Sequence, residues 1–280
     1  MCFSEQHVNW LFDTGERLCT ADGKEIEIWE FQHEEDEEIL SAWARHFRNH
    51  YCLDTEIDWR KGGDRRADFL KKYIFPDPKS RLGPSTRAGD FGEILVADYL
   101  EYRLGYWVPR FRWMLKPTRN ESTKGCDVIG FKIEQTGSSS DDTLYVIEVK
   151  TKFSKGGGNS LQNAINDSEK DDIRIAESLN FLRQKMIYHG DSHNAKQIER
   201  FQSPEDHPYQ NKYGASFIVS SEYFDDQKIS QSNCQEIKKS KKSKESTPHR
   251  HRKNLVLLVI RGANMMKLVH ELYRRAADEA

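Results

Sequence analysis

The spacing of apolar and polar residues predicts two elements in the first eighty residues of the chain. Polar and apolar positions alternate over residues 25–29, as they do in a strand with one buried face. Apolar residues then recur at helical spacing over residues 35–49, and the acidic residues at the start of this segment suit a helix dipole. A passage with several prolines and a glycine at 75–84 indicates a boundary. We therefore expect a small N-terminal α+β module over residues 1–80 and a second domain over residues 81–280.

The second domain shows strands and helices in an order typical of a mixed sheet. A stretch rich in glycine, serine and aspartate separates two apolar strands, which indicates an antiparallel hairpin. The predicted elements are helices over residues 85–105, from after the glycine-rich loop at 156–158 to about 188 (in pieces) and over 263–277, and strands over residues 107–114, 127–133, 144–150, 216–220 and 255–260. This order predicts an α/β (α+β) fold, in which helices flank a mixed β-sheet.

Composition predicts a soluble, globular protein. Hydrophobic residues make up 36% of the 280 residues and charged residues 31%. The longest apolar run, residues 255–260, is too short to span a membrane, and the N-terminal residues lack the pattern of a secretory signal. The five cysteines are scattered, and none forms a Cys-x-x-Cys pair. We expect a cytoplasmic protein with reduced thiols and no membrane attachment.

The basic residues are concentrated near the C-terminal end, although the formal net charge is only −2. Residues 238–253 carry a dense run of lysine and arginine with a single acid, Glu245. Such a run can place a positive field against phosphate, and a solvated loop is the alternative interpretation.

Two kinds of site are not indicated by any motif. The ten histidines show no metal-binding spacing that we favour, since the nearest approach, His249 and His251, lies among cations. The glycines at 156–158 lack the Gly-Lys-Ser/Thr ending of a phosphate-binding loop. We therefore expect no histidine metal site, and any ATP hydrolysis must come from a partner.

The residues that indicate chemistry are Asp127, Glu148 and Lys150. Glu148 and Lys150 are two positions apart in a predicted strand, so their side chains project from the same face. If the strand that begins at Asp127 pairs antiparallel with it, the Asp127 carboxylate can lie beside Glu148. Carboxylates, a backbone carbonyl and waters form the oxygen site that Mg²⁺ prefers, with Mn²⁺ as a possible substitute. Such a metal can polarise a phosphate, while Lys150 orients water or stabilises developing charge.

A surface ion pair is the alternative interpretation of Glu148 and Lys150, because Glu-x-Lys pairs are common on exposed strands and stabilise little. The surrounding pattern favours the site. Residues 144–149 are apolar apart from Glu148, so the charges lie where burial is expected. Buried charges are costly without a partner or a metal, and Asp127 on the preceding strand supplies such a partner.

The order of these residues resembles the PD-(D/E)XK nuclease signature. Asp127 is followed on the next strand by Glu148-Val149-Lys150, with Cys126 where that family often has proline. The resemblance implies a restriction-endonuclease-like core in which the two acids bind the metal and the lysine is catalytic.

The same family implies two further site residues. It often places a glutamate on the helix before the first catalytic strand, and Glu93 fits this position as a metal ligand. A capping box formed by Asp90 and Glu93 at a helix start is the alternative. A polar residue on the helix after the lysine strand often lies near the metal, and the spacing favours Gln162 among the candidates.

A closer resemblance covers residues 85–152. The stretches at 89–95, 109–113 and 124–131 are similar to the HamA family, the nuclease subunit of the Hachiman anti-phage defence system. This resemblance implies a metal-dependent DNA nuclease that acts as an effector. It also implies a partner helicase, HamB, that holds the nuclease in check until foreign or damaged DNA is sensed.

Basic residues beside the signature are the candidate DNA contacts. Lys116, Arg119 and Lys124 precede the first catalytic strand, and Lys152 shares the face of the catalytic lysine. Isolated basic residues in turns often serve only solubility, which is the alternative for each of them.

Other interpretations of the chain remain. Arg110 and Arg112 alternate with aromatic residues, which suits phosphate contact and base stacking, but we favour an ordinary amphipathic strand. A non-catalytic nucleic-acid-binding subunit that positions DNA for a partner is the alternative function. An interaction protein whose charged runs serve assembly is the third possibility.

Overall fold

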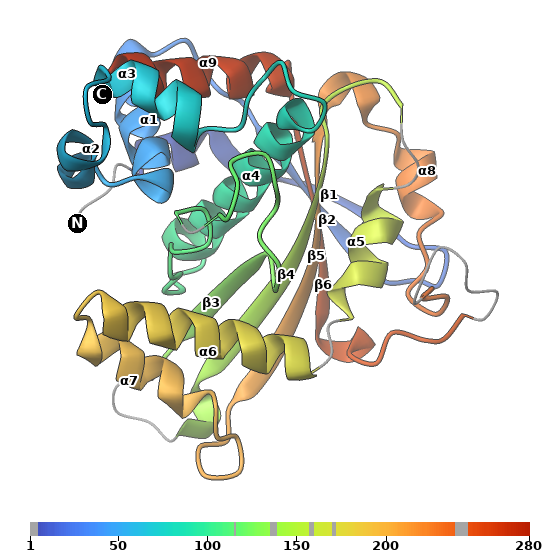
Figure 1. The fold of residues 1–280 in the computed structure, drawn as a ribbon. Coiled ribbons are helices and arrows are strands. Elements are labelled where there is room, and N and C mark those ends of the chain that lie inside the picture. Colours follow the sequence, from blue (N-terminus) through green and yellow to red (C-terminus); the bar gives the residue numbers. More distant parts are fainter. Residues whose placement is uncertain (1–4, 115, 135–138, 157–159, 170–171, 239–245) are drawn as a thin grey trace.

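A single mixed sheet runs through the part of the molecule that the computed structural model describes, which comprises residues 5–114, 116–134, 139–156, 160–169, 172–238 and 246–280. The strand order is β1-β2-β6-β5-β4-β3 (Figure 1). The four inner strands are parallel to one another, and β1 and β3 pair antiparallel at the two edges. The strands are β1 (Leu11–Cys19), β2 (Glu25–Phe31), β3 (Val128–Lys132), β4 (Thr143–Lys152), β5 (Gln210–Ser220) and β6 (Leu255–Gly262).

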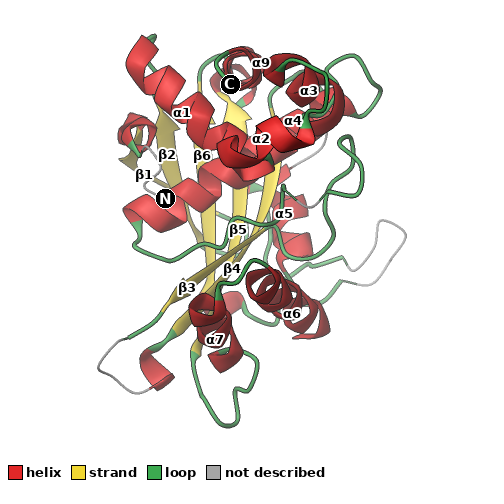
Figure 2. Ribbon diagram, turned by 60° about the vertical axis from the view of Figure 1, so that its left-hand side comes forward, coloured by secondary structure: helices red, strands yellow, loops and turns green. Residues whose placement is uncertain are grey.

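Helices cover both faces of this sheet (Figure 2). One face packs against α1, α4 and α9 in a core that includes Trp43, Ile94 and Leu272. The other face packs against α5, α6 and α7, through residues such as Leu161 and Leu179. The helices are α1 (Glu37–Tyr51), α2 (Asp54–Arg60), α3 (Arg66–Phe69), α4 (Gly83–Asp98), α5 (Ser160–Ser168), α6 (Asp172–Tyr188), α7 (Ser192–Arg200), α8 (Asp226–Ser230) and α9 (Met265–Asp278).

Short helical turns complete the list of elements. The 3₁₀ turns are η1 (Gln6–Trp10), η4 (Ser139–Asp141), η5 (Ser221–Tyr223) and η6 (Arg252–Asn254), and the π-helical turns are η2 (Leu70–Ile74) and η3 (Tyr99–Arg103). The predicted α/β fold, a mixed sheet flanked by helices, is confirmed.

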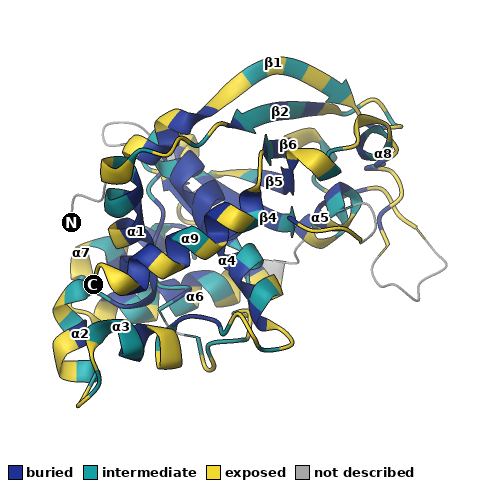
Figure 3. Cartoon of the chain, turned by 90° about the horizontal axis from the view of Figure 1, so that it is seen from above, coloured by how far each residue is buried: buried dark blue, intermediate teal, exposed yellow. Residues whose placement is uncertain are grey.

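The inner and edge strands differ in burial, as their sequences require. Every residue of β5 from Tyr213 onward is buried, whereas β1 mostly alternates between exposed and partly exposed residues at the outer edge (Figure 3). A parallel strand covered on both faces reads as a continuous apolar run, which is why residues 216–220 were recognised as a strand. The earlier half of β5 and all of β1 were not predicted, because their polar residues hide the pattern.

The first eighty residues belong to the same sheet and core as the remainder. β2 pairs with β6 in parallel, from Ile26 opposite Leu257 to Phe31 opposite Gly262. Helix α1 packs against α9, and the Trp43 ring lies 5.7 Å from the ring of Phe91 on α4. The boundary expected near residue 80 therefore coincides with no break in the sheet or in the core.

One predicted strand is wrong. Residues 107–114 form only an isolated bridge, from Trp107 to Phe131, and are otherwise irregular. Pro109 removes a backbone donor from the segment, and the following arginines turn inward to acidic partners instead of alternating between two faces.

Helix α4 begins before its predicted start, and two glycines set its position. Pro84 lies in the first turn, where a missing N–H costs nothing. A Cβ at Gly83 would lie 1.6 Å from the carbonyl oxygen of Asp77, so only glycine fits there. A Cβ at Gly92 would lie 2.4 Å from Cγ2 of Thr151, which shows how closely α4 lies on β4. This close approach fixes the height of Glu93 above the sheet.

Among the residues described, none of the helices has both the length and the apolar character needed to cross a membrane.

Candidate active site

The antiparallel pairing of β3 with β4 brings Asp127 to Glu148. Val128 lies opposite Ile147, so Asp127, one residue earlier, falls at the level of Glu148. Its Oδ2 accepts a hydrogen bond of 3.0 Å from the backbone N–H of Val149. Asp127 is thus fixed to the backbone of β4 directly beside the second acid, as the sequence predicted.

Glu148 and Lys150 lie on the face of β4 that α5 covers. Their neighbours Tyr145, Ile147 and Val149 belong to the core under α4, so the alternate positions point the other way. Glu148 is only 4% exposed, and its Oε1 accepts a hydrogen bond of 2.6 Å from Nζ of Lys150.

Asp167 on α5 is a third member of this group that sequence reasoning missed. Its Oδ2 lies 2.8 Å from Nζ of Lys150. Burial alone would lower the pKa of Lys150, but Glu148 and Asp167 outweigh burial and hold that pKa above its ordinary value. The lysine is therefore charged at neutral pH. The signal that could have identified Asp167 is that it is the single acid on the helix after the lysine strand.

Glu93 is a buried carboxyl on α4 that is joined to Asp127, just before β3, through Arg112. Its Oε2 accepts hydrogen bonds from Nε of Arg112 at 2.8 Å and from the indole N–H of Trp113 at 3.2 Å. Burial raises the pKa of Glu93 to about 8, and the nearby carboxylates of Asp127 and Asp90 add to this, against the opposing effect of Arg112.

Arg112 is the cation that joins Glu93 to Asp127. Its Nη2 lies 3.0 Å from Oδ1 of Asp127, and the same guanidinium donates to the backbone carbonyls of Thr123 and Cys126, both at 2.8 Å. The sequence interpretation of Arg112 as part of an ordinary strand is wrong. Local spacing could not identify this role, because both acidic partners come from other elements.

The acids present a donor set that suits Mg²⁺, since all of its atoms are carboxylate oxygens. Asp127 immediately precedes β3 and lies level with Glu148 on β4, whereas Arg112 stands between Glu93 and Asp127. Among the residues described, oxygen atoms of the three acids do not all lie within 4.8 Å of one another. Asp127 and Glu148 are therefore the residues best placed to hold a metal, and Glu93 stays a predicted ligand.

Gln162 lies on α5, and its side-chain amide forms hydrogen bonds with Asn233 and Asn166. Its Oε1 accepts a 2.7 Å hydrogen bond from the N–H of Asn233, and its Nε2 donates to the carbonyl of Asn233 at 3.1 Å and to Oδ1 of Asn166 at 2.9 Å. These bonds tie α5 to the segment after α8. On this helix, Asp167 is the residue that the structure brings to Lys150.

Helix α4 excludes the capping box that was the alternative for Glu93. Asp90 lies well inside α4 rather than at its start, and it is 2% exposed. Both of its carboxylate oxygens accept from Nζ of Lys116, at 2.5 and 2.6 Å, and Oδ2 also accepts from the Tyr51 hydroxyl.

That ion pair also corrects the prediction for Lys116. Its side chain is 5% exposed and is committed to a buried carboxylate, so it does not present its charge to DNA at the surface. Arg119 is also engaged, with Asp77 at 3.2 Å and the carbonyl of Lys71 at 2.7 Å.

The remaining two predicted DNA contacts lie closer to the surface. Lys124 is exposed and lines a pocket of about 200 Å³ beside Asp127, whose other walls include Arg112, Ser178 and Phe181. Lys152 is half-buried at the end of β4. Both stay predictions.

The C-terminal basic run lies partly outside the described residues, at 239–245. Two of its described arginines have acidic partners: Arg250 lies 3.3 Å from Glu169, and Arg252 lies 2.9 Å from Asp22.

The fold and the site together define a class of protein. A mixed sheet covered by helices on both faces, with Asp127 at the start of β3 and Glu148 and Lys150 on the neighbouring β4, is an α/β protein with a nuclease-like core. The family model for HamA matches residues 6–276, nearly the whole chain, so the chain belongs to the HamA family. It is accordingly a component of a Hachiman defence system. No curated protein matches the sequence.

Proposed function

We propose that this HamA family member is a metal-dependent DNA nuclease, the effector subunit of its defence complex. The observation that supports this most strongly is the group formed by Asp127, Glu148 and Lys150. Asp127 is hydrogen-bonded to the backbone beside Glu148, and Lys150 is held 2.6 Å from the Glu148 carboxylate. A buried acid beside a fixed cation, on the strand next to the edge of the sheet, is an arrangement suited to phosphodiester hydrolysis.

In the proposed reaction, each residue has a separate task. Asp127 and Glu148 would hold Mg²⁺ or Mn²⁺, which supplies Lewis-acid polarisation of the phosphate and a bound water of lowered pKa. Lys150, charged and held between Glu148 and Asp167, donates hydrogen bonds to the attacking water or to a phosphate oxygen as negative charge develops there. Arg112 keeps the Asp127 carboxylate oriented toward β4.

Restraint by a helicase partner is part of the same proposal. It rests on membership of the HamA family and on the expectation that a nuclease which is always active would damage its own host. The given sequence contains no Gly-Lys-Ser/Thr loop. A separate ATP-hydrolysing subunit is therefore needed to couple the sensing of DNA to the release of the nuclease from restraint.

Cleavage of plasmid and linear DNA tests the proposal. The purified chain is assayed alone and with its neighbouring helicase and ATP, in Mg²⁺, in Mn²⁺ and in EDTA. Metal-dependent cutting should fall at least about a hundredfold in Glu148→Gln, because the variant loses a negative metal ligand. Glu205→Gln changes an exposed carboxylate after α7 and should cut at the parent rate.

Two outcomes would overturn the proposal. Undiminished cutting by Glu148→Gln would remove Glu148 from the site. An absence of cutting in every preparation, with DNA binding intact in EDTA, would instead favour a subunit that only positions DNA for its partner.

A further inference from the structure

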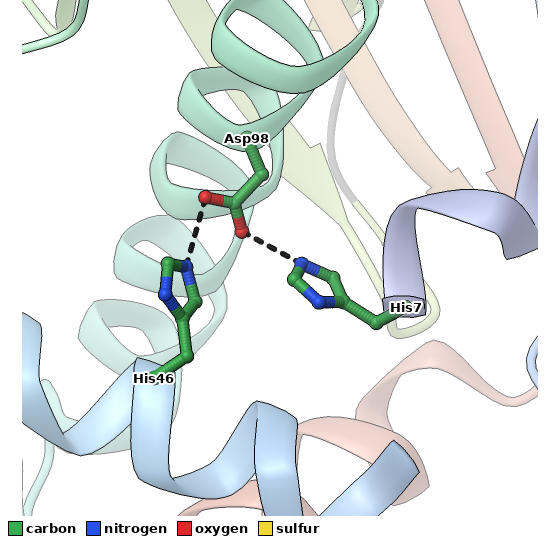
Figure 4. Close-up of side chains that lie close together, drawn as sticks. All are labelled: His7, His46 and Asp98. Atoms are coloured by element: carbon green, nitrogen blue, oxygen red, sulfur yellow. Dashed lines mark hydrogen bonds and ion pairs between the residues drawn. The ribbon is translucent and has the colours of Figure 1, made fainter. Parts of the chain in front are cut away.

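A second group of chemically capable side chains lies at the far end of α4, away from the candidate active site. His7 comes from η1, His46 and His50 from α1, and Asp98 is the last residue of α4. His7 and His46 approach the two oxygens of the same carboxylate from opposite elements (Figure 4). All four side chains are at most 1% exposed. Nothing in the proposed nuclease chemistry uses them.

The contacts within this histidine–aspartate cluster all converge on Nε2 atoms. Nε2 of His7 lies 2.9 Å from Oδ2 of Asp98, and Nε2 of His46 lies 3.0 Å from Oδ1. Nε2 of His50 in turn lies 3.0 Å from Nε2 of His46. His46 and His50 are separated by four residues, so they project from one face of α1 as the paired histidines of helical metal sites do.

A count of protons shows that these contacts fit a cation better than hydrogen bonds alone. Nε2 of His46 carries at most one proton, yet it faces both a carboxylate oxygen and another ring nitrogen. If it donates to Asp98, its single proton must also serve His50. If it accepts from His50, its lone pair faces the carboxylate. A metal ion among the nitrogens and the carboxylate removes this conflict, since each atom then offers a lone pair.

The carboxylate of the cluster has a further partner outside it. Arg110 lies 2.9 Å from Oδ1 of Asp98 and is also paired with Glu101. An arginine on a ligating carboxylate is an outer partner that holds the ligand in place.

We propose that His7, His46, His50 and Asp98 form a structural zinc site. Three imidazoles and a carboxylate complete a four-coordinate set with no position for water, which is the pattern of closed structural sites. Zn²⁺ bonds of ~2.0–2.1 Å separate tetrahedral ligand atoms by roughly 3.3 Å. The ligand atoms of His7, His46 and Asp98 lie within 4.8 Å of one another, so they must close by up to roughly 1.5 Å to hold the ion. His50, whose Nε2 lies 3.0 Å from that of His46, must turn toward the other two ligands to complete the set.

The site would fasten the N-terminal turn to two helices. His7 and Asp98 are 91 residues apart, and His46 and Asp98 are 52 residues apart, so the ion closes long loops. Cross-links that close long loops restrict the unfolded chain most. The expectation from the sequence that no histidine metal site exists is therefore replaced by this proposal.

Metal analysis of the full chain tests the proposal. The protein is produced with a tag that lacks histidine, and its zinc content is measured by mass spectrometry after dialysis. We expect about one Zn²⁺ per chain. His46→Ala and Asp98→Asn should each lower the content at least about tenfold. His193→Ala removes an exposed histidine on α7 and should leave the content unchanged. Glu148→Gln should also retain the zinc, which separates this site from the proposed nuclease site.

A second measurement keeps the proposal testable if the variants do not fold. The wild-type chain is stripped with a strong chelator and its melting temperature is followed while Zn²⁺ or Co²⁺ is returned. The melting temperature should fall on stripping and recover at one equivalent, and Co²⁺ should give the visible absorption of a tetrahedral complex. Wild-type protein that holds no zinc after growth and refolding in Zn²⁺, with a melting temperature indifferent to chelation, would overturn the proposal.

Discussion

Helix α4 contributes a carboxylate to each of two groups that differ in openness and in donor chemistry. Toward its middle, Glu93 lies near a group of carboxylates and one lysine, in which the Asp127 side chain is 13% exposed and that of Lys150 is 30% exposed. At its last residue, Asp98 contacts the ring nitrogens of His7 and His46, and all three side chains are 0% exposed. The first group is open to solvent and the second is not.

Under the two proposals, one helix serves two purposes. An accessible oxygen site binds a hard, partly hydrated cation and leaves room for a reacting phosphate. A sealed nitrogen-rich site binds a softer cation and contributes to folding. The tests below separate the two groups, beginning with the one expected to have the largest effect.

Lys150→Met should separate catalysis from metal binding in the candidate active site formed by Asp127, Glu148 and Lys150. We expect DNA cleavage to fall at least about a hundredfold, because no cation remains to orient water or to stabilise the phosphate. Mn²⁺ affinity, measured by calorimetry, should be retained, since Glu148 and Asp127 remain and Asp167 gains freedom. Glu148→Gln should lose both cleavage and metal affinity. A Lys150→Met protein that cuts like the parent would remove this lysine from the mechanism.

Arg112→Gln should destabilise the metal-free protein by about 3 kcal/mol, because it leaves Glu93 and Asp127 without the cation that joins them. Urea denaturation in EDTA measures this loss. Adding Mg²⁺ should recover part of it, since the divalent ion compensates the same carboxylates. Arg183→Gln breaks an exposed pair with Glu199 and should change stability by less than about 1 kcal/mol. Equal losses in the two variants would contradict a special role for Arg112.

Gly92→Ala should cost about 1–3 kcal/mol, because the new methyl group would overlap Cγ2 of Thr151 and push α4 away from β4. Thr151→Ser removes that carbon and should rescue part of the loss in the double variant. Gly89→Ala, on the same helix with nothing within 4 Å, should instead stabilise by about 0.5–1 kcal/mol. Thermal denaturation of the four proteins decides whether close packing sets the height of α4.

Lys124→Ala should have the smallest effect. If this exposed lysine contacts a DNA phosphate, the slope of log affinity against log salt concentration should become less steep by about one in the variant. The DNA affinity itself should fall by the same factor for all sequences. Fluorescence anisotropy in EDTA at several salt concentrations measures both. Lys196→Ala, an exposed lysine on α7, is the matched control. Identical salt dependences for the two variants would show that Lys124 does not contact DNA.

Much of the fold could be predicted, because burial imposes a period on the sequence. Helices α1 and α9 and strands β3, β4 and β6 were recognised nearly at their observed bounds, since each carries a clear apolar face or run. The pairing of Asp127 with Glu148 was also accessible, because a hairpin relates neighbouring strands by local rules. These are the parts of the site that depend on short separations along the chain.

The rest depends on contacts between distant elements, which spacing does not encode. Arg112 lies in a segment whose alternation resembles a strand, and only its buried acids explain its position. Asp167 reaches Lys150 because α5 folds back over β4. The histidine–aspartate cluster draws on η1, α1 and α4, and its only local sign was the spacing of His46 and His50.

The parallel pairing of β2 with β6 also constrains the order of events during folding. β2 precedes its inner neighbour in the sheet, Leu255–Gly262, by most of the length of the sequence. Pairing across such a separation is slow because a long loop must close first. We therefore expect β1 and β2 to dock on β6 late in folding, after the β3–β4 hairpin that carries the candidate site has formed.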